Sequence, residues 1–260
     1  MNPYAVCSPC TPRCVTRSRP PVSRLKTVKR WGRLVGALAA AAPASAHGEK
    51  LGGHARRVLD ALDVGLETPE RRLSVPGATG TLLVANHISW LDIVGLLAVE
   101  PVGFLAKREV ADWPVFGSMA TRTGTIFLDR EALRALPGGV ARLASLLRSG
   151  RSVVVFPEGT TWCSAPGGQF RRAAFQAALD AGAPIRPLTI SYREGAVPST
   201  IAALVGDDTL AASLHRVASA RELTLRIDAH PVLLAVGDRR ALAEAARGAV
   251  TGDRGGLTRV

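Results

Sequence analysis

The chain contains no long run of apolar residues. None of its segments approaches the roughly 18 consecutive apolar positions that a membrane-spanning helix needs, so the sequence predicts no such helix. A hydrophobic fraction of 47% over 260 residues is nevertheless enough for one large domain with a substantial core. The composition therefore favours a globular fold.

Cysteine is scarce, and its distribution argues against a disulfide framework. The four cysteines are Cys7, Cys10, Cys14 and Cys163. The first three could suggest a metal site, but no second Cys or His pair lies nearby in the sequence, so we expect no metal. Cys163 is isolated in the sequence and is expected to be inert. Such cysteine usage is typical of a reducing compartment.

Acidic residues are absent before Glu49, and aromatic residues make up only 5% of the chain. The net charge is +12, which predicts an anionic partner such as lipid headgroups, acidic substrates or nucleic acid. A nucleic-acid-binding protein should interleave aromatic and basic residues along one face. Most of the aromatics here lie outside the basic N-terminal region, so this class remains only a remote alternative and we expect no nucleic-acid partner.

The most informative stretch runs from Asn86 to Asp92. It follows an apolar run at residues 82–85 that is typical of a buried strand. A neutral imidazole at His87 can take a proton from a hydroxyl, and a carboxylate at Asp92 can orient the imidazole and stabilise its charged form. The alternative is that His87 is an ordinary histidine at a helix start and Asp92 a solvated acid of the first turn.

A second buried strand, at residues 153–156, leads into Pro157-Glu158-Gly159-Thr160. Pro157 cannot donate to a sheet ladder, so the strand should end there. Gly159 permits a tight turn that presents backbone N–H groups. Strand ends of this kind are where open α/β sheets bind ligands.

Taken together, the segments resemble the glycerolipid acyltransferase family, of the lysophosphatidic acid acyltransferase type. The resemblance covers residues 75–235 and rests on four ordered blocks. These blocks are Asn-His-x4-Asp at residues 86–92, Gly-x-x-Phe-x-x-Arg at 124–130, Phe-Pro-Glu-Gly-Thr at 156–160, and a strand with a proline at 184–190. A lysine often found after the first block is matched by Lys107.

The resemblance implies direct acyl transfer from a thioester, either acyl-CoA or acyl carrier protein, to a lysophospholipid hydroxyl, most simply that of 1-acylglycerol-3-phosphate, in phospholipid biosynthesis. His87 would be the general base and Asp92 its orienting partner. Lys107 and Arg130 would hold an anionic headgroup, and the acceptor pocket would be shaped by Glu158, Gly159 and Thr160. No cofactor or metal is implied beyond the thioester co-substrate.

Three alternatives stay open within this interpretation. Arg130 could be a surface arginine paired with a neighbouring acid, and Glu158 could cap a helix. Thr161 stands where many relatives carry an arginine after Glu-Gly-Thr. Because that loop is expected to border the acceptor site, lyso-ornithine or another amino-acid lipid is the alternative acceptor.

Strand-like and helical segments alternate, which predicts an α/β fold with a mostly parallel sheet covered by helices. We expect strands at residues 73–75, 82–85, 102–106, 125–128, 153–156, 185–191 and 223–229. Residues 51–240 should form the acyltransferase domain, and residues 241–260 a C-terminal helix with a frayed tail.

Residues 1–50 are expected to form a basic, largely disordered or interfacial arm, of which residues 1–33 can be removed without unfolding the domain. Their basic stretch, short apolar run and Ala44-Ser45-Ala46 also match the outline of a signal peptide. An exported enzyme would lack its cytosolic thioester donor, so the arm is preferred. It would hold the protein at the cytoplasmic face of the membrane, bound peripherally or monotopically to an anionic surface.

Overall fold

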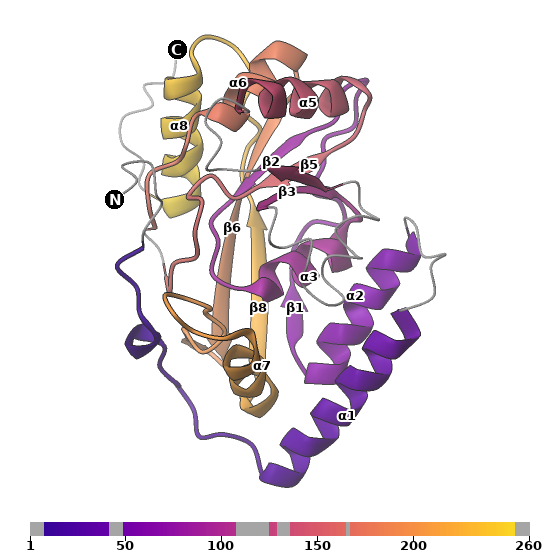
Figure 1. Ribbon diagram of the computed structural model, residues 1–260, viewed down its shortest axis with the longest axis vertical. Helices are drawn as coiled ribbons and strands as arrows, with labels where there is room; N and C mark the ends of the chain where they lie inside the picture. The colour runs from indigo at the N-terminus through magenta and orange to yellow at the C-terminus, as the bar shows by residue number, and fades with distance from the viewer. Residues whose placement is uncertain (1–7, 42–48, 108–124, 129–135, 165–166, 253–260) are drawn as a thin grey trace.

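A computed structural model describes residues 8–41, 49–107, 125–128, 136–164 and 167–252 (Figure 1). One twisted sheet organises them. Its strand order is β1 (Gly65–Glu67), β8 (Leu223–Ala229), β6 (Ile185–Glu194), β2 (Leu82–Ala85), β5 (Val153–Val155), β3 (Gly103–Lys107) and β4 (Ile126–Leu128), with β7 (Val197–Pro198) beside β6. Among the described strands, only the pairings of β6 with β7 and β8 are antiparallel. The predicted α/β fold with a mostly parallel sheet is confirmed.

Helices cover both faces of the sheet, and the strand sequences show why. Every residue of β2 and β5 is buried, as expected for parallel strands enclosed on both sides. Successive residues point to opposite faces, so Leu83 and Ala85 join one core cluster whereas Leu82 and Val84 join the other. The core therefore consists of two layers separated by the sheet.

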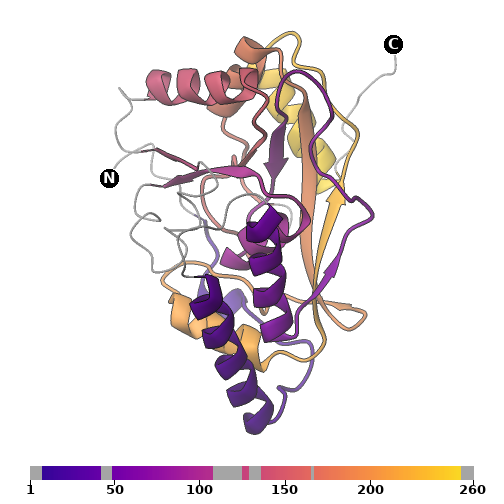
Figure 2. The same ribbon diagram turned by 90° about the vertical axis from the view of Figure 1, so that its right-hand side faces the viewer.

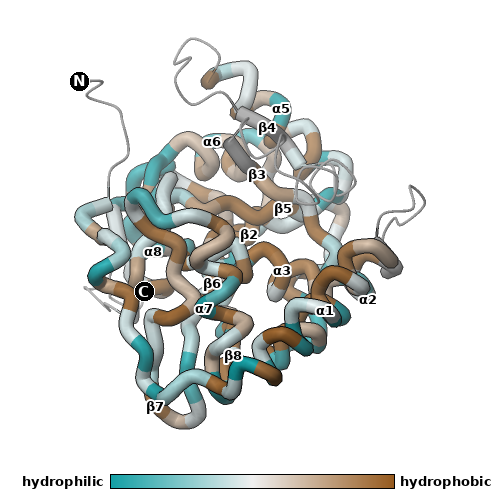
Figure 3. The backbone as a smooth tube through the Cα atoms, turned by 60° about the horizontal axis from the view of Figure 1, so that its bottom comes forward, coloured by the Kyte–Doolittle hydropathy of each residue, from teal (hydrophilic) through white to brown (hydrophobic). Residues whose placement is uncertain are grey.

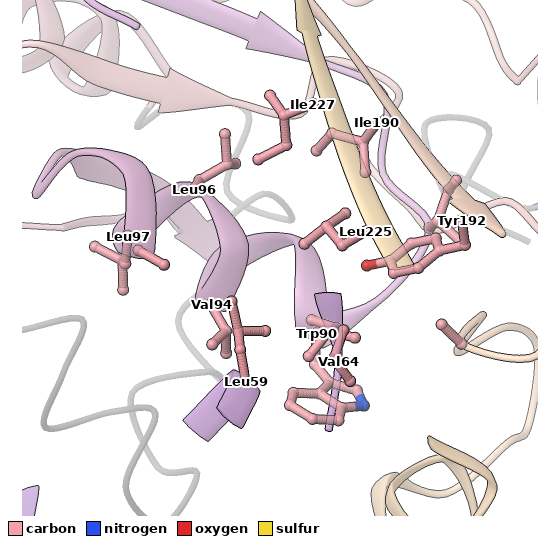
Figure 4. Close-up of a cluster of buried hydrophobic side chains, with 14 of the residues drawn as sticks. Leu59, Val64, Trp90, Val94, Leu96, Leu97, Ile190, Tyr192, Leu225 and Ile227 are labelled. Atoms are coloured by element: carbon pink, nitrogen blue, oxygen red, sulfur yellow. The ribbon is translucent and has the colours of Figure 1, made fainter. Parts of the chain in front are cut away.

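The first layer is built from α2 (Glu49–Leu62), α3 (Trp90–Val99) and α7 (Leu210–Ser219). Figure 4 shows its centre, where Leu96 of α3 lies near Ile227 of β8, and Val94 of the same helix lies beside Leu59 of α2. The second layer is built from α5 (Leu136–Arg148), α6 (Ala173–Ala181) and α8 (Arg239–Thr251). The tube coloured by hydropathy shows the hydrophobic stretches concentrated in α3 and the central strands (Figure 3).

The N-terminal segment departs from the predicted disordered arm. Residues 8–23 run along the domain through a short 3-10 turn, η1 (Pro12–Cys14), and lead into α1 (Arg24–Ala41), which lies beside α2 (Figures 1 and 2). Arg30 is 2% exposed and donates hydrogen bonds to the carbonyls of Ala218 and Ala220 and to Asp63. Disorder is therefore a wrong prediction for residues 8–41. That the segment can be removed without unfolding the domain stays a prediction, and the contacts of Arg30 argue against it.

Two further differences concern the ends of elements. Residues 73–75 do not form the predicted strand, because the Glu100 carboxylate accepts hydrogen bonds from the backbone N–H groups of Leu73 and Ser74 at 2.7 and 2.9 Å. The predicted C-terminal helix is α8, which packs on β6 and α6 as part of the domain. The predicted frayed tail, from residue 253 onward, lies outside the described residues.

Candidate active site

The carboxyl ends of β2 and β5 bring the two sequence motifs together. These strands are parallel neighbours, with Val84 opposite Val155, so the loops that follow them leave the sheet at the same edge. The rings of His87 and Phe156 stack with centroids 4.0 Å apart, and the backbone N–H of Trp162 donates to the His87 carbonyl at 2.8 Å. The motif after β5 therefore supports the histidine from two directions.

Asp92 fixes the imidazole of His87. Its Oδ2 lies 2.8 Å from His87 Nδ1 and also accepts the backbone N–H groups of Ile88 and Ser89 at 2.7 and 2.9 Å. A carboxylate oxygen that already accepts two N–H groups can only accept from the ring, so Nδ1 carries the hydrogen and Nε2 keeps its lone pair. The His87 side chain is 19% exposed, and within the described residues Nε2 has no hydrogen-bond partner.

The same carboxylate also begins helix α3. Ser89 and Asp92 form a capping box, in which each side chain accepts a backbone N–H of the other end. Asp92 is completely buried, so it is not the solvated acid of the alternative interpretation. One residue thus holds the start of the helix and the orientation of the ring.

Tyr192 is a site residue that sequence reasoning missed. Its hydroxyl donates to Asp92 Oδ1 at 2.5 Å from the interior of β6. Burial first, and then the Asp92 charge, raise the pKa of the Tyr192 phenol well above its ordinary value, so it remains a donor. No local pattern marks this tyrosine, since it lies 100 residues beyond its partner.

Asn86 stabilises the fold around the site and does not take part in the proposed chemistry. Its side-chain amide donates to the Ile190 carbonyl at 2.9 Å and accepts the Ile190 N–H at 2.7 Å, in the manner of a backbone pair. The backbone ladder between β2 and β6 ends at Ala85 and Leu188, and the Asn86 side chain continues the pairing beyond that point. It holds His87 and Tyr192 at a fixed separation.

Glu158 is buried behind the histidine. Its Oε2 accepts the His87 N–H at 2.9 Å, and the Gly168 N–H is a second donor to the carboxyl. Burial, followed by the nearby Asp92 charge, raises the Glu158 pKa to about 7 against those two hydrogen bonds. Gly167 approaches this carboxyl closely, and a Cβ there would lie 1.6 Å from Glu158 Oε1, so any other residue would displace the carboxyl. Glu158 sits in a turn, so the helix-cap alternative is wrong.

The other predicted site residues are placed less completely. Gly159 adopts a positive φ of 76°, but its N–H donates to the Phe156 carbonyl within the turn, and this geometry does not support a role for it as a ligand donor. Thr160 is half-buried in the same turn. Lys107 ends β3 opposite Leu128, at the edge where His87 lies, and its side chain is outside the described residues. Arg130 also lies outside them.

The cysteines are not distributed as the sequence suggested. Cys163 is not isolated, because its sulfur lies 3.2 Å from that of Cys10, and Cys14 completes a group of three. Cys7 lies outside the described residues. This group lies beside the loop after β5 rather than at His87.

Comparisons with known proteins agree with the geometry. Residues 67–191 match the family model described as Acyltransferase. The chain is 37% identical over 173 residues to the 1-acyl-sn-glycerol-3-phosphate acyltransferase of Neisseria meningitidis serogroup B, covering 66% of this chain and 67% of that protein. It is 38% identical over 172 residues to the lyso-ornithine lipid O-acyltransferase of Pseudomonas aeruginosa, covering 65% of this chain and 66% of that protein.

A solved structure supports the fold separately. The 1-acyl-sn-glycerophosphate acyltransferase PlsC of Thermotoga maritima superimposes with a TM-score of 0.59 over 88% of this chain and 92% of that chain, at 19% identity. The paired motifs at the carboxyl ends of β2 and β5, the matched domain and these relatives lead to one conclusion. The chain belongs to the acyltransferase family, whose relatives here are named 1-acyl-sn-glycerol-3-phosphate acyltransferase and lyso-ornithine lipid O-acyltransferase.

Proposed function

We propose that the protein transfers a fatty acyl group from a thioester donor, acyl-CoA or acyl carrier protein, to the hydroxyl of 1-acylglycerol-3-phosphate. His87 supports this proposal most directly, because Asp92 holds its Nδ1–H at 2.8 Å and leaves Nε2 as a base at the accessible side of the ring. The scheme needs no cofactor and no metal, since the substrate supplies the nucleophile.

The reaction balances with these groups alone. Nε2 of His87 accepts the proton of the acceptor hydroxyl as its oxygen attacks the thioester carbonyl. The carbon–sulfur bond then breaks, and the departing thiolate receives the proton from the imidazolium. Asp92 stabilises the imidazolium between these two steps.

The acceptor headgroup is assigned to the cationic residues of the matched blocks. Lys107 ends β3 at the carboxyl edge of the sheet, and Arg130 follows β4, its neighbour. A guanidinium binds phosphate in a bidentate way that an ammonium does not reproduce. Thr160, next to the supporting Glu158, is proposed to border the same pocket.

A lyso-ornithine lipid is the second candidate acceptor. The relative with that printed name is as similar to this chain as the glycerophosphate relative, at 38% against 37% identity. Such an acceptor carries a carboxylate and an amine in place of a phosphate monoester. It would therefore depend less on a bidentate arginine.

The proposed location is the cytoplasmic face of a membrane, where the thioester donors are found. In the described part of the chain no helix is both long and apolar enough to cross a membrane. Helix α1 instead exposes Leu25, Val28 and Val35 on the face opposite its buried Arg30 and Leu34. Apolar side chains flanked by Arg and Lys suit the surface of an anionic bilayer.

The test uses purified protein, labelled acyl-CoA or acyl carrier protein, and three acceptors: 1-acylglycerol-3-phosphate, lyso-ornithine lipid and lysophosphatidylcholine. The first is expected to be acylated fastest. His87→Ala should lower kcat by at least about 10²-fold with an unchanged circular dichroism spectrum, whereas the exposed His215→Ala should not. Near-wild-type turnover by the His87 variant would refute the mechanism.

Arg130→Lys separates the two acceptors. With a phosphate acceptor, kcat/KM should fall by about 10- to 150-fold through a higher acceptor KM, while the donor KM stays constant. With lyso-ornithine lipid the change should be small. If the substitution alters only the donor KM, Arg130 binds the thioester carrier and its assignment to the acceptor is wrong.

A further inference from the structure

Three thiols from two distant parts of the chain meet at the loop that follows β5. The sulfur atoms of Cys10, Cys14 and Cys163 all lie within 4.8 Å of one another. Cys10 is buried, and the other two are half-buried. The acyl-transfer scheme uses none of them.

Local backbone structure places the first two sulfurs together. The 3-10 turn η1 is closed by hydrogen bonds from the Cys14 N–H to the Thr11 carbonyl at 2.9 Å and from the Val15 N–H to the Pro12 carbonyl at 3.1 Å. It folds Cys14 back toward Cys10 across three intervening residues, a spacing common between two ligands of one zinc ion. Cys163 arrives from the loop after β5.

The distances suit coordination by one ion. Sulfur ligands at about 2.3 Å around a tetrahedral zinc are about 3.8 Å from one another. The Cys10–Cys163 sulfur separation is 3.2 Å, and the Cys163 N–H donates to the Cys10 sulfur at 3.4 Å. An N–H group aimed at sulfur is the outer contact that supports a bound thiolate.

A disulfide explains this arrangement less well. A bond between Cys10 and Cys163 would need their sulfurs at about 2.05 Å and would leave Cys14 without a role. It would also need an oxidant. One ion uses all three sulfurs, and three thiolates around a divalent cation leave a net negative charge. The surrounding N-terminal segment, which has no acidic residue before Glu49, can balance that charge.

We propose that Cys10, Cys14 and Cys163 form a binding site for one thiophilic divalent cation, of which Zn²⁺ is the principal candidate. All-sulfur ligation selects soft metals over Mg²⁺ or Ca²⁺. Each thiol releases its proton when it binds the metal. Water or an added thiol completes the coordination at the exposed side.

The site would connect the N-terminal segment to the supports of the catalytic base. Cys163 directly follows Trp162, whose N–H holds the His87 carbonyl at 2.8 Å. Metal binding would therefore fix both the path of residues 8–14 and the loop beneath His87. Its function is structural, and it is independent of which acceptor the enzyme uses.

The experiment is a titration of the full-length, reduced, metal-free protein with Co²⁺ under anaerobic conditions, followed by displacement with Zn²⁺. One equivalent of Co²⁺ should produce thiolate-to-cobalt charge-transfer absorption, and one equivalent of Zn²⁺ should abolish it. Cys14→Ser and Cys163→Ser should each weaken binding by more than the roughly 10- to 100-fold that loss of an outer-shell partner costs. Thr11→Ala, an exposed position in the same turn, should bind like the wild type.

A second measurement does not depend on the folding of any variant. In the wild-type protein, Zn²⁺ should slow alkylation of Cys14 and Cys163, as read by peptide mass spectrometry. The proposal is overturned if folded wild-type protein shows no charge-transfer absorption, or if both cysteine variants bind like Thr11→Ala. It is also overturned if anaerobically prepared protein contains a Cys10–Cys163 disulfide that blocks Co²⁺.

Discussion

Replacing Asp92 with asparagine isolates the charge of this residue from its geometry. Oδ2 receives two backbone N–H groups, from Ile88 and Ser89, in addition to His87 Nδ1–H. An amide NH₂ placed there would oppose three donors, so the asparagine must keep its oxygen in that position. Its NH₂ then faces Tyr192, whose hydroxyl can rotate to accept. The helix cap, the ring orientation and the tautomer are all preserved.

The expected loss is therefore electrostatic. Two unit charges about 4 Å apart interact by about 4 kcal/mol at an effective dielectric constant near 20. Asp92 is completely buried and the ring is mostly buried, so this value applies to the imidazolium formed during transfer. Since each 1.36 kcal/mol changes the rate tenfold, kcat should fall by about 10²- to 10³-fold.

The assay measures steady-state acylation together with thermal unfolding. Asp92→Asn should lower kcat with little change in either KM, and its Tm should stay close to that of the wild type. Asp92→Ala should lose the capping interactions as well, and its Tm should fall. A kcat within threefold of the wild type for Asp92→Asn would show that the carboxylate does not stabilise the imidazolium.

Two other predictions concern stability. Burial raises the pKa of Glu158 to about 7 from an ordinary value of 4.5, so the free energy of unfolding should decline by about 3 kcal/mol as the pH rises from 4.5 to 7. In urea titrations, Glu158→Gln should remove this part of the decline. Glu244→Gln, at an exposed position, should leave it unchanged. Arg30→Ala should lower the free energy of unfolding by at least about 1.5–3 kcal/mol, since buried charge-assisted hydrogen bonds to Ala218 and Ala220 are lost, whereas the exposed Lys29→Ala should have no such effect. Equal stabilities of the two N-terminal variants would contradict the packing of α1.

Local patterns were sufficient for the centre of the fold. The apolar runs at residues 82–85 and 153–156 are buried on both sides, so they stand out from the polar loops that follow them. His87 and Asp92 are only five residues apart, so a single turn of the chain brings their side chains together. The carboxyl-edge rule for parallel strands then places the second motif beside the first.

The N-terminal helix was missed because its first turns invert the usual pattern. In these turns α1 buries Thr27 and Arg30, whereas Leu25 and Val28 are exposed. Apolar residues face the domain only further along the helix, at Leu34. The buried polar groups are satisfied by the Ser23 carbonyl and by carbonyls near residue 219, the second of which no local sequence pattern reveals.

Contacts between distant parts of the chain were equally hidden. Tyr192 meets Asp92 over 100 residues, and Cys10 meets Cys163 over 153. The first follows from strand order and the second from the path of the N-terminal segment, and a single sequence specifies neither. The region 73–75 shows the converse, since an apolar segment became a loop when the Glu100 carboxylate captured its N–H groups.

The packing of the N-terminal segment has a consequence for synthesis on the ribosome. Arg17 contacts Ser219, Arg19 contacts Glu222 and Arg30 contacts Ala220, so this segment emerges roughly 200 residues before its partners. At typical rates of 5–20 residues per second, roughly 10–40 s separate the emergence of these partners. Throughout that interval a nascent chain presents an unpaired basic segment, free to meet an anionic surface before the enzyme around it exists.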